Sequence, residues 1–228
     1  AGESALELLR RATGAGERGG SLLMTSANSA RVAETLADLR GAAMKLGQLL
    51  SLQGEGMLPP RLREALAQLQ SHAHFMPEAQ VRQVLTREFG RGWKSRFAEF
   101  DFEPLAAASI GQVHAATASD GRDLALKLQY PGIERSIDGD VDNLVLVLRG
   151  LRLVPSGLDL DRVIPELKEE LRREADYARE ARSQAQYRNL VGADPAVLVT
   201  RVLADLSTRS VLATDRVRGL PLEDLRSP

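Results

Sequence analysis

The spacing of hydrophobic positions predicts an all-helical first part of the chain. Apolar residues recur at three- and four-residue steps over residues 30–52, 61–70 and 77–89, as they do on one face of a helix. A short helix is also expected over 5–11, followed by a Gly-rich link over 14–21. Two glycines lie inside the predicted helix 30–52, so we expect either a close neighbour or a break there.

The pattern changes near Trp93 to one that is typical of strands. Phe97, Phe100 and Phe102 have the spacing of a short strand. Residues 113–117 and 124–128 then predict a β-hairpin, with its turn at 119–122. The elements expected after it are a helix over 138–153, a long helix over 161–190, and strands over 196–202 and 210–217. This order predicts an α+β fold with an antiparallel sheet and one long helix.

The predicted hairpin follows a loop of small residues and carries a lysine in its second strand. Protein kinases cover ATP with G-x-G-x-x-G-x-V and then V-A-I-K. On that template Ala106 and Ala108 take the first two glycine places, Gly111 the third and Val113 the valine, while Lys127 ends L-A-L-K. Such a lysine neutralises phosphate charge. The alternative is a surface lysine on an edge strand.

Three carboxylates in the predicted long helix are candidate partners for that lysine. Glu174 and Asp176 are two residues apart, so they point in nearly opposite directions on a regular helix. Glu180 is rotated by about 120° from Glu174. The alternative is a charged, solvated face, since other acidic residues and several arginines surround them.

Composition narrows the classes of function. Hydrophobic residues make up 43% and charged residues 27%, which is normal for a globular domain, and the net charge of −1 gives no reason to expect nucleic acid as a partner. The absence of cysteine excludes disulfides and thiol chemistry and fits a reducing compartment. The apolar run 144–148 is too short to cross a membrane. Without clear carboxylate partners, His72, His74 and His114 are not expected to hold a metal.

Three blocks of sequence together resemble the UbiB/AarF family of atypical kinase-like ATPases, also called the coenzyme Q kinase-like family. They are RGAAMKLGQLLSLQG with LPP after it, PLAAASIGQVHAA with LALKLQYPGI, and EADYAREA, and the similarity runs over about residues 40–222. The resemblance implies a protein-kinase-like small lobe over 93–220, preceded by a helical extension over 1–92 that lies over the peptide-substrate site. Residues 221–228 would then start the hinge link to a large lobe.

The resemblance also implies roles for particular residues. Lys45 and Gln48 belong to the K-x-G-Q motif, which would be regulatory, and Lys45 would pair with Glu174 and Asp176. Lys127 would pair with Glu180. The expected nucleotide contacts are Ala106, Ala107, Ala108, Ser109, Gly111, Val113, Ala125 and Lys127 under the alanine-rich loop, with Asp215 and Val217 at the hinge. Because alanine is restricted at positive φ, we expect a stiffer loop than a glycine-rich one.

Family membership would mean binding of ATP or ADP with Mg, ATP hydrolysis, and support of ubiquinone biosynthesis or membrane lipid homeostasis. The sequence has no D-F-G and no H-R-D, so we expect the front half of a longer protein, with the metal ligands in the large lobe and little ATPase activity in this chain alone. Expected partners are quinone-biosynthesis proteins, quinone precursors or an anionic membrane surface, in the cytoplasm or peripherally at the inner face of a membrane. A conventional protein kinase and a non-catalytic helical module that binds a partner or membrane are the alternatives.

Overall fold

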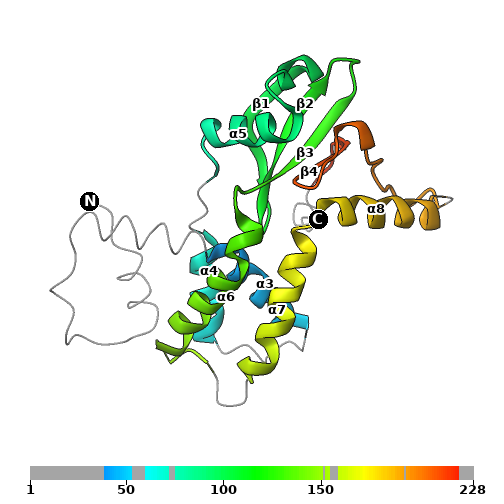
Figure 1. Cartoon of the computed structure of the whole chain (residues 1–228). Helices are drawn as coiled ribbons and strands as arrows, with labels where there is room; N and C mark the ends of the chain where they lie inside the picture. The colour runs from blue at the N-terminus through cyan, green and yellow to red at the C-terminus, as the bar shows by residue number, and fades with distance from the viewer. Residues whose placement is uncertain are drawn as a thin grey trace. The chain divides into compact units, whose positions relative to one another are not determined.

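The computed structural model of the chain describes residues 39–52, 60–71, 75–150, 152–154, 159–192 and 194–220 (Figure 1). The expected helix over 5–11, the Gly-rich link, the start of the helix expected from residue 30, the pair His72 and His74, and the segment 221–228 lie outside the described residues.

The chain forms two compact units, each built from two separate stretches of sequence. The helical unit contains α3 (Arg40–Leu52), α4 (Pro60–Ser71), α6 (Ile133–Gly150) and α7 (Leu160–Glu174). The sheet unit contains α5 (Glu78–Phe89), the 3-10 helix η1 (Trp93–Arg96), β1 (Phe97–Ala107), β2 (Gly111–Ala118), β3 (Asp123–Gln129), α8 (Tyr177–Val191), the 3-10 helix η2 (Ala204–Leu206) and β4 (Val211–Asp215). The expected boundary at residue 92 therefore does not coincide with the units, because α5 belongs with the sheet and α6 and α7 belong with α3 and α4.

The helical unit is held together by the apolar faces that the sequence pattern predicts. Leu46 from α3 and Leu39, which directly precedes that helix, are fully buried, as are Leu144 from α6 and Leu167 from α7. Helix α3 runs without a break through both of its glycines. Ion pairs such as Lys168 to Asp142, at 2.7 Å, lie between the exposed sides of α6 and α7.

The sheet is antiparallel, with the strand order β1-β2-β3-β4. The hairpin of β2 and β3 has a regular register in which Val113 lies opposite Lys127. Strand β1 is an edge strand with register shifts along its length, which is a common way to blunt an exposed edge. The strand predicted over 196–202 is wrong: only Val202 makes a bridge, with Thr214 of β4.

The two faces of this sheet have different roles. Leu124, Leu126 and Leu128 point to the core, where they pack with the apolar side of α5 and with an aromatic cluster around Trp93. Since successive side chains of a strand point to opposite faces, Lys127 and Gln129 lie on the other face. The sheet thus separates the hydrophobic core from the face that carries the candidate lysine.

A buried polar chain on the core face fixes the protonation of His114. Its Nδ1 lies 2.8 Å from the carbonyl oxygen of Asp101, so Nδ1 must be the donor. Its Nε2 then accepts from the side-chain amide of Gln112 at 2.7 Å, and Gln112 Oε1 accepts from Met76 N–H at 2.7 Å. Burial lowers the pKa of the His114 imidazole, with the carbonyl of Asp101 acting in the opposite direction. His114 is therefore a neutral structural residue.

The long helix predicted over 161–190 is wrong, because the chain forms two helices there. Helix α7 ends at Glu174 and α8 begins at Tyr177. The carbonyl oxygen of Ala175 accepts from Gln129 Nε2 at 2.8 Å, and the carboxylate of Asp176 accepts from Arg179 N–H at 2.9 Å. An aspartate that caps a new helix competes with continuation of the old one. Glu174 and Glu180 therefore lie on two different helices, and their directions are not related by the angle of one regular helix.

Candidate functional site

The central feature of the sheet unit is the ion pair of Lys127 on β3 with Glu180 on α8. Lys127 Nζ lies 2.8 Å from both carboxylate oxygens of Glu180. Glu180 lies in the first turn of α8, where the helix dipole favours a negative charge. The Lys127 side chain is 23% exposed, so its ammonium group is held in place while solvent still reaches it.

Other predicted contact residues lie on the same sheet face as Lys127. Val113 is directly opposite it on β2, and Ala106 on β1 is opposite Val113 in turn. Ala125 precedes Lys127 by two residues and so shares its face. Ala107 pairs with Gln112, which belongs to the core face, so its side chain points away from Lys127. Of Ala106 and Ala107, Ala106 is the one that the register places on the face of Lys127, with Val113 between the two.

The alanine-rich loop is a tight hairpin between β1 and β2. Ala108 N–H donates to the carbonyl oxygen of Gly111 at 2.8 Å, and the carbonyl oxygen of Ile110 accepts from Tyr130 N–H at 3.0 Å. Ile110 is buried and anchors the loop, while Ser109 lies at its tip. Neither Ala106 nor Ala108 has a positive φ. Ala106 and Ala108 thus have backbone conformations that alanine adopts freely, and the expectation of a loop stiffer than a glycine-rich one stays a prediction.

Gly111, by contrast, cannot carry a side chain. A Cβ placed on it would lie 2.3 Å from the carbonyl oxygen of Leu128 and 2.8 Å from the phenol oxygen of Tyr177. Both distances are shorter than real Cβ contacts. The third glycine of the template is thus required by close packing inside the sheet unit.

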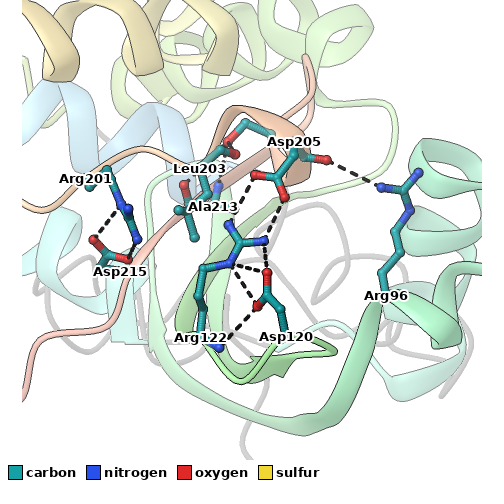
Figure 2. A network of polar contacts seen from close by, with 9 residues as sticks. Arg96, Asp120, Arg122, Arg201, Leu203, Asp205, Ala213 and Asp215 are labelled. Carbon is teal, nitrogen blue, oxygen red and sulfur yellow. Dashed lines mark hydrogen bonds and ion pairs between the residues drawn. The ribbon is translucent and has the colours of Figure 1, made fainter.

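The predicted hinge residues lie at the end of β4: Asp215 is its last residue, and Val217 follows two positions later. The N–H of Asp215 donates to the carbonyl oxygen of Arg201 at 3.0 Å, and its carboxylate pairs with the Arg201 guanidinium at 3.1 Å (Figure 2). The N–H of Arg216 donates to the carbonyl oxygen of Asp123 at 3.0 Å. Val217, which comes next, has a side chain that is 51% exposed. Of the two residues predicted to meet adenine, Asp215 already has its N–H engaged within the protein, which leaves Val217 as the better candidate.

An arginine fork ties the β2–β3 turn to the segment that leads into β4. Arg122 donates to both oxygens of Asp205, at 3.2 and 2.8 Å, and to both oxygens of Asp120, at 2.9 and 2.8 Å (Figure 2). These hydrogen bonds hold the pKa of each carboxyl group below its usual value. The fork joins two parts of the sheet unit that are more than eighty residues apart in sequence.

The helical unit contains a second lysine–carboxylate pair. Lys45 Nζ on α3 lies 2.6 Å from Glu174 Oε1 on α7 and 3.8 Å from Glu170 Oε2. Glu170 and Glu174 are one helical turn apart and so flank the same ammonium group. Gln48, three residues after Lys45, is exposed. Asp176, expected to share Lys45 with Glu174, caps α8.

Three residues at these pairs were not predicted from the sequence. Gln129 donates to the carbonyl oxygen of Ala175 between α7 and α8, and the ring of Tyr177 lies 4.6 Å from Lys127 Nζ. Glu170 is the second carboxylate near Lys45. The i,i+2 spacing of Lys127 and Gln129 was the available signal, because it places both side chains on one sheet face. No signal in the sequence pointed to Tyr177 and Glu170, because both lie in a stretch whose pattern is that of one charged, solvated helix.

The described residues fit the phosphate end of a nucleotide better than a metal. An ammonium group has three donors, and Glu180 takes two of those of Lys127, so one remains for an anionic ligand. Within the described ranges, no group of three or more His, Asp or Glu side chains could hold a metal ion. Lys127 and the backbone of the hairpin loop would hold the phosphates, and Val217 would meet the base.

Comparison with known proteins gives consistent matches over most of the chain. The sequence profile described as the ABC1 atypical kinase-like domain matches residues 68–227. The chain is 40% identical over 205 residues to "Atypical kinase COQ8, mitochondrial" of Saccharomyces cerevisiae, covering 90% of this chain and 41% of the yeast protein. It is 31% identical over 203 residues to "Probable protein kinase UbiB" of Marinobacter nauticus, covering 86% of this chain and 36% of that protein.

A solved structure is also similar. The complex of Rv3197 with erythromycin from Mycobacterium tuberculosis is 34% identical, with a TM-score of 0.53, and the match covers 83% of this chain and 48% of that one. The chain thus spans less than half the length of the curated relatives named above. None of the described helices combines the length and the apolar character needed to cross a membrane.

Proposed function

Because the chain belongs to the family of ABC1 atypical kinase-like domains, we propose that its sheet unit binds the phosphates of ATP or ADP. The observation that carries this proposal is the Lys127–Glu180 pair, in which Nζ is 2.8 Å from both carboxylate oxygens. Kinases need this kind of lysine–glutamate pair to hold the α- and β-phosphates. The tight hairpin of small residues beside the pair supports the same assignment.

Each of these residues has a distinct task in the proposed site. Lys127 neutralises phosphate charge. Glu180 holds the ammonium group of Lys127 on the face of the sheet opposite the hydrophobic core. Val113 and Ala106 give this face a small apolar surface, because their side chains lie in the row beside Lys127. A bound Mg–nucleotide would supply the transferable phosphoryl group. The chain's own contribution is orientation and charge neutralisation, which account for most of the catalysis in phosphoryl transfer.

For the longer protein we propose an atypical kinase or ATPase that supports ubiquinone biosynthesis or membrane lipid homeostasis. The similarity to proteins described as "Atypical kinase COQ8" and "Probable protein kinase UbiB" supports this role. Alanine in place of the first two loop glycines disfavours a conventional protein kinase. The Lys45–Glu174 pair in the helical unit is the proposed regulatory element of the K-x-G-Q motif.

Nucleotide-dependent thermal stabilisation tests the phosphate-binding proposal. A ligand at 100 times its Kd stabilises a protein by about 2.7 kcal/mol, which is about 5–11 °C in Tm for a chain of this size. Mg-ADP should raise the Tm of the wild type, and Lys127→Ala should abolish most of that rise because the phosphate charge is no longer neutralised. The matched control is Lys168→Ala, since Lys168 is a similarly covered lysine that pairs with Asp142 in the helical unit.

Two results would contradict the proposal. One is a wild-type chain whose Tm does not respond to Mg-ADP or Mg-ATP at millimolar concentration. The other is a Lys127→Ala variant that responds as strongly as the Lys168→Ala control.

A further inference from the structure

Tyr177 occupies an unusual position for a residue at the start of an exposed helix. It is the first residue of α8 and is completely buried. Within α8, all of which the structure describes, it is the one residue that is buried. Its N–H donates to the carbonyl oxygen of Arg209 at 3.3 Å. The buried contact of α8 with the sheet unit is therefore made by its first residue, next to Lys127. Farther along the helix, Gln184 donates to the carbonyl oxygen of Thr200 at 3.0 Å.

The ring of Tyr177 faces the ammonium group that the proposed function uses. Lys127 Nζ lies 4.6 Å from the ring centroid, within the range of a cation–π interaction. Glu180 follows three residues later on the same side of α8 and accepts from the same Nζ. The ammonium group is thus held between an aromatic face and a carboxylate that come from a single helical turn.

The other end of the same side chain reaches the base of the hairpin loop. The phenol oxygen would be only 2.8 Å from a Cβ on Gly111, the first residue of β2. Tyr177 therefore spans from the loop base to Lys127, beneath the strand pair that carries both. A displacement of the first turn of α8 would move the aromatic face, the carboxylate and the support under the loop together.

We propose that Tyr177 is a positioning residue for Lys127. Its aromatic face holds the ammonium group in the direction of Glu180, so that the lysine is pre-set for an anionic ligand before that ligand binds. This proposal deepens the proposed function and rests on it for its purpose, but the positioning itself is a property of the free chain. Preorganised charge of this kind lowers the ordering cost of binding.

The reactivity of Lys127 in the ligand-free chain measures the positioning directly. A water-soluble amine-acylating reagent is added at fixed pH, and the labelling rate of each lysine is read by peptide mass spectrometry. Lys168 is the internal reference, because its side chain is 19% exposed against 23% for Lys127 and its ion pair lies in the other unit. The ratio of the two rates removes differences in reagent and in overall stability.

Two substitutions separate the aromatic face from simple space filling. Tyr177→Phe keeps the ring and should leave the Lys127-to-Lys168 ratio unchanged. Tyr177→Leu keeps a smaller apolar side chain without a π face and should raise the ratio roughly two- to thirtyfold, the range that a cation–π contact spans. Thermal unfolding of both variants checks that each is folded at the labelling temperature.

The outcomes distinguish this inference from the proposed function. A ratio in Tyr177→Leu equal to that of the wild type would overturn the positioning role, and so would a Tyr177→Phe variant that behaves like Tyr177→Leu. Repeating the labelling of the wild type in the presence of Mg-ADP tests nucleotide binding at Lys127 separately. If Tyr177→Leu raises the ratio but Mg-ADP never protects Lys127 in the wild type, the positioning role stands and nucleotide binding at this lysine fails.

Discussion

Replacing Gly111 with alanine should destabilise the sheet unit even without any ligand. The added Cβ would lie 2.3 Å from the carbonyl oxygen of Leu128, and this separation must grow to about 3.0 Å to become tolerable. Gly111 is paired with Gln129 in the ladder between β2 and β3, so the atoms that must move are backbone atoms of two hydrogen-bonded strands. No flexible side chain can absorb the overlap with this carbonyl group.

The expected cost follows from that displacement. Overpacking a core usually costs about 1–3 kcal/mol, and a backbone shift of about 0.7 Å in a paired strand places Gly111→Ala at the upper end. About 3 kcal/mol corresponds to a fall in Tm of roughly 6–12 °C for a chain of this length. The measurement is thermal unfolding of the ligand-free chain by circular dichroism.

The matched control is Gly92→Ala. A Cβ on Gly92 meets nothing within 4 Å and its φ of −85° suits alanine, so the Tm should stay within about 2 °C of the wild type. The double variant Gly111→Ala/Tyr177→Phe removes the contact with the phenol oxygen but leaves the overlap with Leu128, so it should recover less than half of the loss. A Gly111→Ala variant as stable as Gly92→Ala would refute the reasoning. Full recovery in the double variant would show that Tyr177 sets the limit.

Two further predictions concern protonation and the arginine fork. Burial lowers the pKa of His114 in the folded chain, so the unfolded chain binds the proton first as the pH falls below about 6.5. The free energy of unfolding should therefore fall with falling pH, by up to about 1.4 kcal/mol per pH unit, until the pH is below the folded-state pKa. Urea unfolding between pH 7.5 and 5.5 should show this dependence of stability on pH in the wild type and a shallower one in His114→Leu. Equal pH dependence in both proteins would contradict the role of His114. Asp205→Asn should lower the Tm by at most about 4 °C, because its bond with Arg122 is exposed to solvent. Since the pKa of Asp205 is lowered in the folded chain, this difference should be present at neutral pH and shrink progressively as the pH falls below about 4. A difference that does not shrink with falling pH would contradict the role of the charge.

Local sequence determined the elements whose signals lie within one segment. The period-two pattern and the Ser-Asp-Gly turn predict the hairpin of β2 and β3, and the structure extends it by only a few residues. The spacing of Ala106, Gly111 and Lys127 predicts a small-residue loop beside a strand lysine, because register within a hairpin follows from the turn. The observed register then places Ala106 and Lys127 on one face of the sheet.

The break at Ala175 could not be read from local pattern, because the residue that bonds its carbonyl group is Gln129, 46 positions earlier. The pattern around Glu174 and Glu180 is that of one charged helix, and helix propensity is a weak prior that tertiary contacts override. The strand expected over 196–202 failed for a related reason. Its contacts with β4 are confined to its last two residues, Arg201 and Val202, and form no more than an isolated bridge.

The sequence by itself determined which residue types this protein has for holding a phosphate: a small-residue loop, a strand lysine and a set of carboxylates. The family resemblance implied that Lys45 pairs with Glu174 and Lys127 with Glu180, and both pairs are present. Only the tertiary structure decided that an aromatic ring also contacts Lys127 and that Asp176 caps a helix instead of sharing Lys45. Glu174 lies with Lys45 in the helical unit, while Glu180 and Tyr177 lie with Lys127 in the sheet unit. The physical reason is that charge and ring contacts act over a few ångströms in space, and the chain brings their partners together from positions 50 to 129 residues apart.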